Sequence, residues 1–208
     1  MMIAITVSTN YHDLLRVTVP ANLKFFKRWI FITDINDIKT IEFLAQYNVI
    51  VLYWDFKNNG RVFDKGGAIA HAQNFAYKHY PDDWYLLLDS DICLSEEFST
   101  VDGLMTSLDQ NAIYGALNRH DYQKYSDYKA RQNYFDYPWG NQLQGYFQLY
   151  KKKEFYVPSS DASKCDIQFL ENFPARFTID GFICSHLGRQ GNWQGRVAGA
   201  DFIFDETD

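Results

Sequence analysis

The chain has 208 residues and a formal net charge of −6, with 47% apolar, 22% charged and 18% aromatic residues. This length and composition are typical of a soluble globular protein with one large domain. The negative charge and the lack of a basic stripe argue against binding to nucleic acid, and no apolar stretch reaches the roughly 18 residues of a transmembrane segment. Three cysteines without a Cys-x-x-Cys pair indicate a reducing compartment, so we expect a cytoplasmic protein.

The first quarter of the chain alternates between strands and helices. An apolar, β-branched run predicts a strand at 2–8 and not a signal peptide, because a basic region and a cleavage site are missing. Helices are expected over 12–26 and 37–47, and strands at 29–33 and 49–53. This alternation predicts a parallel sheet flanked by helices, with right-handed crossovers.

The ends of the first two strands suggest a nucleotide pocket. The loop after the first strand offers hydroxyls, backbone amides and a ring that could stack on a base. Its candidate cofactor-binding residues are Thr6, Val7, Ser8 and Tyr11. Asp34 follows the second strand, where it would meet a ribose or a base edge; it could equally cap the next helix. The sequence has no Gly-x-Gly-x-x-Gly after the first strand and no P-loop motif, which disfavours dehydrogenases and P-loop enzymes.

A loop rich in Gly and Asn, at 57–67, carries two cations, Arg61 and Lys65, and a helix is expected directly after it at 68–79. Loop amides, a helix N-terminus and a lysine together would make an anion-binding site. The alternative is a plain entry into the helix, in which the glycines serve the turn.

Five apolar residues at 84–88 run directly into Asp89, Ser90 and Asp91. Such a run predicts a strand that is buried on both faces. Burying bare carboxylates is costly, so two of them at the end of this strand need a cation or a role. Because ligands of an open α/β sheet bind beyond the carboxyl ends of its strands, Asp89 and Asp91 are placed to share one divalent ion. The alternative is that the pair caps a turn.

The second half of the chain is expected to add a helix that begins at Ser95 and a short helix over 166–173. Further strands are expected at 112–117, 145–150 and 177–184. The segment 118–136 is polar, rich in tyrosine and irregular in pattern, and we interpret it as a mobile segment over the cleft. The sequence contains no internal repeat and no low-complexity linker, so one domain is expected.

Together these features resemble the GT-A fold nucleotide-sugar glycosyltransferases. The resemblance rests on the Asp89-Ser90-Asp91 triplet, the strand at 145–149 and the segments 186–188 and 192–196. Within this class the chain most resembles the small viral or bacterial domains, including the N-terminal domain of chlorella-virus glycosyltransferases, which implies a viral protein and is compatible with further fused domains. It implies a single-domain α/β GT-A (Rossmann-like) fold, with a central, mostly parallel mixed sheet flanked by helices. The nucleotide-binding half would cover about 1–94 and the acceptor or sugar-binding half about 95–208.

The resemblance implies a metal site made of Asp89, Asp91 and His186, which would hold Mn²⁺ or Mg²⁺ against the diphosphate of a UDP-sugar. A mixed set of oxygen and imidazole ligands favours Mn²⁺. The metal would act as a Lewis acid on the leaving UDP. A single histidine near a strand end is otherwise a structural residue in many proteins. Further candidates around the donor are Arg61, Lys65, Ser90, Gly188 and Arg189.

The catalytic candidates are Asp91 and Asp166. Asp166 lies in the part of the chain where inverting members of the class have a carboxylate base, which would deprotonate the acceptor hydroxyl. It could equally be the N-cap of the helix that follows. Rings stack on sugar faces, while amides and guanidinium groups bond hydroxyls. The substrate-binding candidates are therefore Trp139, Gln148, Asn192, Trp193 and Arg196.

The predicted function is transfer of a hexosyl or deoxyhexosyl group from a UDP-sugar to a glycan or another hydroxyl acceptor, in the cytoplasm, including that of an infected host cell. Two alternatives stay open. A sugar-phosphate nucleotidyltransferase would need a glycine-rich signature with Arg and Lys after the first strand, which the residues at 9–13 do not provide. A non-catalytic nucleotide- or sugar-binding domain is excluded only weakly by the sequence.

Overall fold

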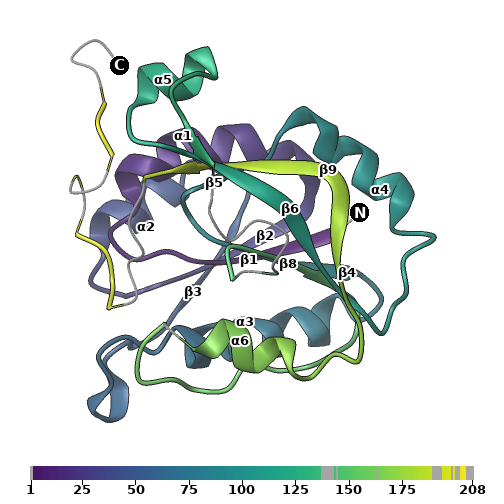
Figure 1. Cartoon of the computed structure of the whole chain (residues 1–208). Helices are drawn as coiled ribbons and strands as arrows, with labels where there is room; N and C mark the ends of the chain where they lie inside the picture. The colour runs from purple at the N-terminus through teal and green to yellow at the C-terminus, as the bar shows by residue number, and fades with distance from the viewer. Residues whose placement is uncertain are drawn as a thin grey trace.

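A mixed sheet forms the centre of the protein (Figure 1). The computed structural model describes residues 2–136, 143, 145–162, 164–188, 194–197, 199 and 202–204. Within these residues the sheet has nine strands in the order β3-β2-β1-β4-β8-β6-β9-β5, and β7 pairs with β6. The strands are β1 (Met2–Val7), β2 (Phe26–Thr33), β3 (Ile50–Tyr53), β4 (Trp84–Leu88), β5 (Ile92–Cys93), β6 (Ile113–Tyr122), β7 (Phe135–Asp136), β8 (Phe147–Tyr150) and β9 (Arg176–Leu187). The helices are α1 (His12–Asn22), α2 (Ile38–Leu44), α3 (Lys65–His79), α4 (Val101–Leu104), α5 (Tyr125–Ala130) and α6 (Cys165–Leu170), with 3-10 turns at Leu23–Phe25, Asn58–Gly60 and Glu96–Thr100.

The first four strands in this order, β3, β2, β1 and β4, run parallel, which confirms the prediction from the alternating pattern. The first helix is shorter than predicted: α1 ends at Asn22, and β2 begins at Phe26, within the stretch expected to be helical. The physical reason is a long-range contact. The Asn22 amide donates to the carbonyl of Ile92 and accepts from the N–H of Leu94, which ties the end of α1 to β5.

Helices cover both faces of these parallel strands. Alternate residues of β1 belong to different cores: Ala4 packs with residues of α1 and α2, whereas Ile5 packs with residues of α3 and α6. In Figure 1, α3 and α6 lie together below the sheet. All five residues of β4 are buried, as expected for a strand whose two faces are both covered.

The turn from β4 to β5 forces the sheet to curl. β4 ends at Leu88 and β5 begins at Ile92, so only Asp89, Ser90 and Asp91 join the two strands. In the order of the sheet, however, β8, β6 and β9 lie between them. In a flat sheet this separation would be about 19 Å, whereas the linker spans at most about 15 Å. The far edge of the sheet must therefore bend back over the carboxyl end of β4, and the turn lies where the two parts meet.

The segment 118–136 is regular, so the prediction of an irregular segment there is wrong. β6 continues to Tyr122 and pairs with β9 as far as Leu187; α5 and β7 then follow. The Tyr122 ring is buried and packs edge-on against Tyr128 of α5, with 5.6 Å between the ring centroids. Tyr122, Tyr125 and Tyr128 therefore form part of a core, which their hydroxyl groups alone could not indicate.

Cys93, Cys165 and Cys184 are buried free thiols. In the part of the chain that the structure describes, no helix is long and apolar enough to cross a membrane. The single sheet includes strands from both predicted halves of the chain. The assignment of one half to the nucleotide and the other to the acceptor stays a prediction.

Candidate metal and nucleotide site

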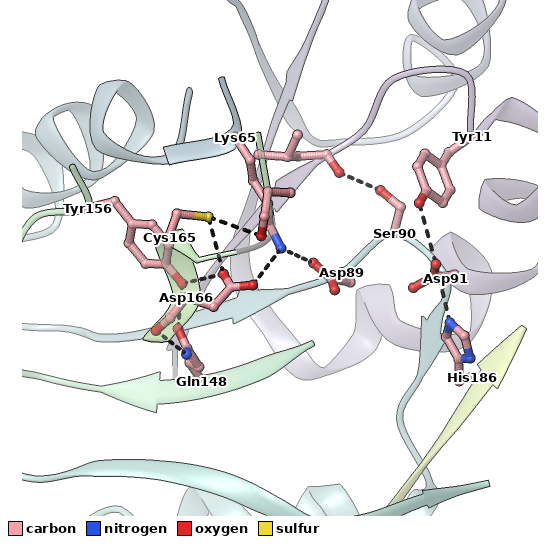
Figure 2. Close-up of polar contacts among 12 residues, drawn as sticks. Tyr11, Lys65, Asp89, Ser90, Asp91, Gln148, Tyr156, Cys165, Asp166 and His186 are labelled. Atoms are coloured by element: carbon pink, nitrogen blue, oxygen red, sulfur yellow. Dashed lines mark hydrogen bonds and ion pairs between the residues drawn. The ribbon is translucent and has the colours of Figure 1, made fainter. Parts of the chain in front are cut away.

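The turn between β4 and β5 presents its two carboxylates to different partners (Figure 2). Oδ2 of Asp91 lies 3.4 Å from Nε2 of His186 and 3.5 Å from the hydroxyl of Tyr11. Oδ1 of Asp89 lies 3.0 Å from Nζ of Lys65. We name the two adjoining groups by their cations. The imidazole cluster comprises Tyr11, Asp91, Asp121 and His186, and the lysine cluster comprises Lys65, Asp89, Tyr156 and Asp166.

Strand pairing positions the imidazole cluster. His186 of β9 pairs with Ile92 of β5 on one side and with Asp121 of β6 on the other. Its Nδ1 lies 3.1 Å from Oδ1 of Asp121, so Nε2 faces Asp91. Burial alone would lower the pKa of His186, but the two carboxylates raise it to about 9. A carboxylate on one ring nitrogen is the arrangement that orients metal-binding histidines. Sequence reasoning missed Asp121, because it lies in the segment that we expected to be irregular.

The lysine cluster joins three elements. Nζ of Lys65, at the start of α3, lies 3.0 Å from Asp89 and 3.3 Å from Oδ2 of Asp166 on α6. Burial alone would lower the pKa of Lys65, but Asp166 and Asp89 raise it well above its ordinary value. Burial, together with the charges of Asp91 and Asp166, raises the pKa of Asp89 to about 6 against the effect of Lys65. The hydroxyl of Tyr156 donates to Oδ1 of Asp166 at 2.9 Å, so both oxygens of this carboxylate are held.

The strand predicted at 145–150 supports Asp166. Gln148 is fully buried; its Oε1, at 2.6 Å, shares the single proton of the Tyr156 hydroxyl with Oδ1 of Asp166, and its Nε2 donates to the carbonyl of Asp166 at 3.4 Å. We therefore correct its predicted role from sugar binding to support of Asp166. The alternative interpretation of Asp166 as an N-cap is wrong, because Lys164 occupies that position. A Cβ at Gly145 would lie 1.9 Å from Oδ2 of Asp166, so the close approach of this carboxylate requires glycine.

The predicted anion-binding loop has a different arrangement. The helix begins at Lys65 and not at 68, because Asp64 caps it and accepts a hydrogen bond from the N–H of Gly67 at 3.0 Å. The N–H of Gly66 donates to a side-chain oxygen of the chain itself, at 3.2 Å. Nη1 of Arg61 pairs with Asp64 at 2.8 Å. The N–H groups of Gly66 and Gly67 and the guanidinium group of Arg61 thus bond other side chains of the protein. This corrects the prediction that Arg61 and the loop amides bind an anion. Of the two predicted cations of this loop, only Lys65 reaches the site.

Other predicted nucleotide-binding residues serve the fold. Thr6 is buried, and its hydroxyl accepts from the indole N–H of Trp29 at 2.8 Å, so we correct its role to core packing. The carbonyl of Val7 accepts from the hydroxyl of Ser90 at 2.8 Å, which holds the aspartate turn against β1. Asp34 accepts from the N–H two residues on, at 2.8 Å, and does not cap α2.

The residues just after β1 contain unsatisfied polar atoms. The hydroxyls of Ser8 and Thr9 and Nδ1 of His12 are buried and have no hydrogen-bond partner among the described residues. Such atoms cost about 1–3 kcal/mol each when nothing bonds them. Their concentration in one short loop beside Tyr11 makes this loop a candidate for contact with a ligand.

Arg196 supports the same loop. Its side chain is buried, and Nη2 donates to Oδ2 of Asp13 at 2.9 Å. Its guanidinium group lies 4.8 Å from the centroid of the Tyr11 ring. We therefore correct its predicted role from sugar binding to positioning Tyr11, whose hydroxyl reaches Asp91.

The predicted three-ligand metal set is not preassembled. No group of three His, Cys, Asp or Glu side chains in the described residues is arranged to hold a metal ion, because Asp89 turns toward Lys65 while Asp91 and His186 face each other. Gly188 follows β9 with a φ of 118° and donates its N–H to the carbonyl of Tyr122. The remaining candidates, Trp139, Arg189, Asn192 and Trp193, lie outside the described residues.

No family model matches the sequence, and no curated protein matches it. Solved structures do share its fold. GalNAc-T7 with UDP, GalNAc and Mn²⁺ aligns with a TM-score of 0.59 over 95% of this chain and 46% of that chain, at 10% sequence identity. A Bacillus anthracis protein assigned as a glucose-1-phosphate thymidylyltransferase, in complex with a sucrose, aligns with a TM-score of 0.51 over 86% of this chain and 87% of that chain, at 13% identity.

These alignments confirm the predicted α/β fold of the GT-A (Rossmann-like) type. This chain spans less than half of the GalNAc-T7 chain that it matches. Sequence identities of 10% and 13% establish a common fold and no more. The closer resemblance to chlorella-virus enzymes stays a prediction.

Proposed function

We propose that this protein is a metal-dependent glycosyltransferase that moves a sugar from a UDP-sugar to a glycan or another hydroxyl acceptor. The observation that carries the proposal is the contact between Asp91 and His186, with Asp121 on the second ring nitrogen, at the carboxyl end of β4. Ligands of open α/β sheets bind at this edge. The same fold holds UDP, GalNAc and Mn²⁺ in GalNAc-T7. A cytoplasmic location and a viral origin are part of the proposal.

The residues present fit a divalent metal ion. Asp91 supplies a hard oxygen and His186 a nitrogen that Asp121 has already oriented. Two protein ligands suit an ion whose remaining positions are filled by water and by the phosphates of a substrate. Mn²⁺ accepts such a mixed set more readily than Mg²⁺. When bound, the ion would offset the charge that develops on the departing diphosphate. Asp89 is adjacent and would become a third ligand if it left Lys65.

The loop after β1 fits the nucleotide. A bound nucleotide would supply hydrogen-bond partners to the buried hydroxyls of Ser8 and Thr9 and to Nδ1 of His12. Its anionic diphosphate would lie beside Lys65 and beside the ion held by Asp91 and His186, whose positive charges favour it.

Asp166 is our candidate for the acceptor side. Lys65 and Tyr156 hold one oxygen each, so the carboxylate has a defined orientation before any substrate enters. In an inverting reaction, Asp166 would accept the proton of the acceptor hydroxyl while that oxygen attacks the sugar. Exchange of its hydrogen bond with Lys65 for one to the acceptor would allow this step without movement of α6.

The donor site is tested by a thermal-shift titration with UDP, first with Mn²⁺ and then with a chelator. UDP at about 100 times its dissociation constant should stabilise the fold by roughly 2.7 kcal/mol. For a chain of this size the melting temperature should rise by about 5–11 °C. We expect the rise to need both UDP and Mn²⁺. An unchanged melt with UDP, GDP, CDP and dTDP in the presence of metal would contradict the proposal.

A second assay distinguishes glycosyl transfer from nucleotidyl transfer. A glycosyltransferase releases UDP from a UDP-sugar, whereas a sugar-phosphate nucleotidyltransferase releases pyrophosphate from an NTP and a sugar 1-phosphate. Both products should be measured, because the B. anthracis protein, which is assigned as a nucleotidyltransferase, has a similar fold. Release of pyrophosphate without release of UDP would reassign the reaction, and binding without either product would indicate a non-catalytic domain.

The raised pKa of His186 predicts that Mn²⁺ binding depends on pH. The ring binds a metal only as neutral imidazole, yet with a pKa of about 9 it is protonated at pH 7 in the metal-free protein. Each ion bound should therefore displace about one proton, and the apparent affinity should rise about tenfold per pH unit up to about pH 9. Calorimetry in buffers with different ionisation enthalpies counts this proton. A His186→Gln variant should bind Mn²⁺ more weakly and without proton release; equal proton release by both proteins would refute the assignment.

A further inference from the structure

A cavity lies on the other side of the strands that carry the imidazole cluster. Its volume is about 500 Å³, which is within the range of small-molecule sites. It is bordered by β5, β6, β9 and α5. Its lining residues are Cys93, Leu94, Ser95, Glu97, His120, Tyr122, Tyr128, Lys129, Arg131, Tyr134, Gly181, Ile183, Cys184 and Ser185.

Strand geometry separates this cavity from the proposed metal site. His120 of β6 pairs with Ser185 of β9, and the next pair along the strands is Asp121 with His186. Successive side chains of a strand point to opposite faces of its sheet. The His120 and Ser185 side chains therefore face the cavity, while Asp121 and His186 face Asp91. The two sites share strands but lie on opposite faces.

Aromatic rings form one wall of the cavity. Tyr134 stacks on His120 with 3.8 Å between the ring centroids and 15° between the planes, and it is 40% exposed. The ring of Tyr122 also contacts Tyr134, with 5.8 Å between the two ring centroids. A flat, partly exposed ring such as that of Tyr134 offers an apolar face with a polar edge. The apolar face of a pyranose ring fits such a surface.

Cations lie over the same cavity. Lys129 and Arg131, at the end of α5, both line it and are exposed. Burial raises the pKa of the Tyr128 hydroxyl, and the positive charge of Arg131 opposes the rise. Glu97 also lines the cavity and is a hydrogen-bond acceptor for hydroxyl groups. The combination of rings, a guanidinium group and a carboxylate matches a ligand with a ring, an anionic group and hydroxyls.

We propose that this cavity binds a sugar that carries a carboxylate or a phosphate, at a site separate from the donor site. Tyr134 would stack on the ring, Arg131 would pair with the anionic group, and Glu97 would accept from hydroxyls. The proposal goes beyond glycosyl transfer and does not depend on it, since no residue of the imidazole or lysine cluster lines the cavity.

Calorimetric titration of the full chain with glucose 6-phosphate and with glucuronate, in EDTA and without nucleotide, tests the proposal. We expect at least one of the two to bind, with glucose and inorganic phosphate at least tenfold weaker. Arg131→Gln and Tyr134→Ala should each weaken binding about tenfold; both side chains are exposed, so the fold should survive. The matched control Arg176→Gln, an exposed arginine at the opposite end of β9, should stay within twofold.

The proposal would be overturned by no binding of either anionic sugar at millimolar concentration, by equal binding of glucose, or by unchanged binding by both cavity variants. Binding of inorganic phosphate as tightly as glucose 6-phosphate would also overturn it, because the rings would then contribute nothing. The donor site is tested separately, because Asp91→Asn should bind the anionic sugar as the unmodified protein does. Loss of UDP binding with retained sugar binding, or the reverse, thus shows which proposal fails.

Discussion

Asp91→Asn is expected to abolish UDP-sugar turnover and the metal-dependent binding of UDP while the fold survives. The substitution keeps the size of the side chain but removes the charged oxygen that faces His186 and the proposed ion. A bound metal stabilises a developing phosphate charge by several kcal/mol, so kcat/KM should fall by about a thousandfold or more. Release of UDP, measured with saturating Mn²⁺, gives the rate, and far-UV circular dichroism confirms the fold.

Two matched variants sharpen this result. Asp121→Asn leaves the proposed metal ligand His186 in place but removes the carboxylate that orients it through Nδ1. Activity or metal affinity should therefore fall about 10–100-fold. Asp82→Asn removes an exposed carboxylate at the other end of β4 and should leave turnover unchanged. The order of effects, Asp91 above Asp121 above Asp82, is the prediction. An Asp91→Asn protein with full activity would contradict the metal-dependent mechanism.

Lys65→Met is expected to destabilise the protein by about 3 kcal/mol, since breaking a buried ion pair leaves its carboxylates without a counter-charge. The Lys65 side chain is 12% exposed and that of Asp166 is 19% exposed, whereas that of Asp89 is 34% exposed and keeps part of its hydration. We therefore expect the lower end of the usual range. The melting temperature should fall by roughly 6–12 °C for a chain of this size, as followed by circular dichroism.

The cause of this loss can be tested with a second substitution. Because Asp89 and Asp166 would repel each other once the lysine is gone, Lys65→Met with Asp166→Asn should be more stable than Lys65→Met alone. Lys57→Met, at an exposed lysine of the preceding loop, is the control and should change stability by no more than about 0.5 kcal/mol. If Lys65→Met behaved like Lys57→Met, the lysine cluster would not stabilise the fold.

Local patterns predicted the elements that local forces decide. The uninterrupted apolar run at 84–88 indicated a strand covered on both faces, and all its residues are buried. The two aspartates that follow it had to lie at the carboxyl end of this strand, because a turn must come where the apolar run ends. The boundaries that were wrong, at the end of α1 and across 118–136, depend on contacts with distant residues such as Ile92 and Leu187.

The sequence by itself determined a parallel sheet with carboxylates at the end of its central strand, because apolar periodicity and the cost of burying charge are properties of neighbouring residues. Only the tertiary structure decided which side chains meet those carboxylates. Asp121 and His186 are 65 residues apart and meet through the pairing of β6 with β9. Lys65 and Asp166 are 101 residues apart and meet because α3 and α6 pack together on one face of the sheet. Such contacts cannot be predicted from the spacing of residues along the chain, because strand order and the curl of the sheet create them.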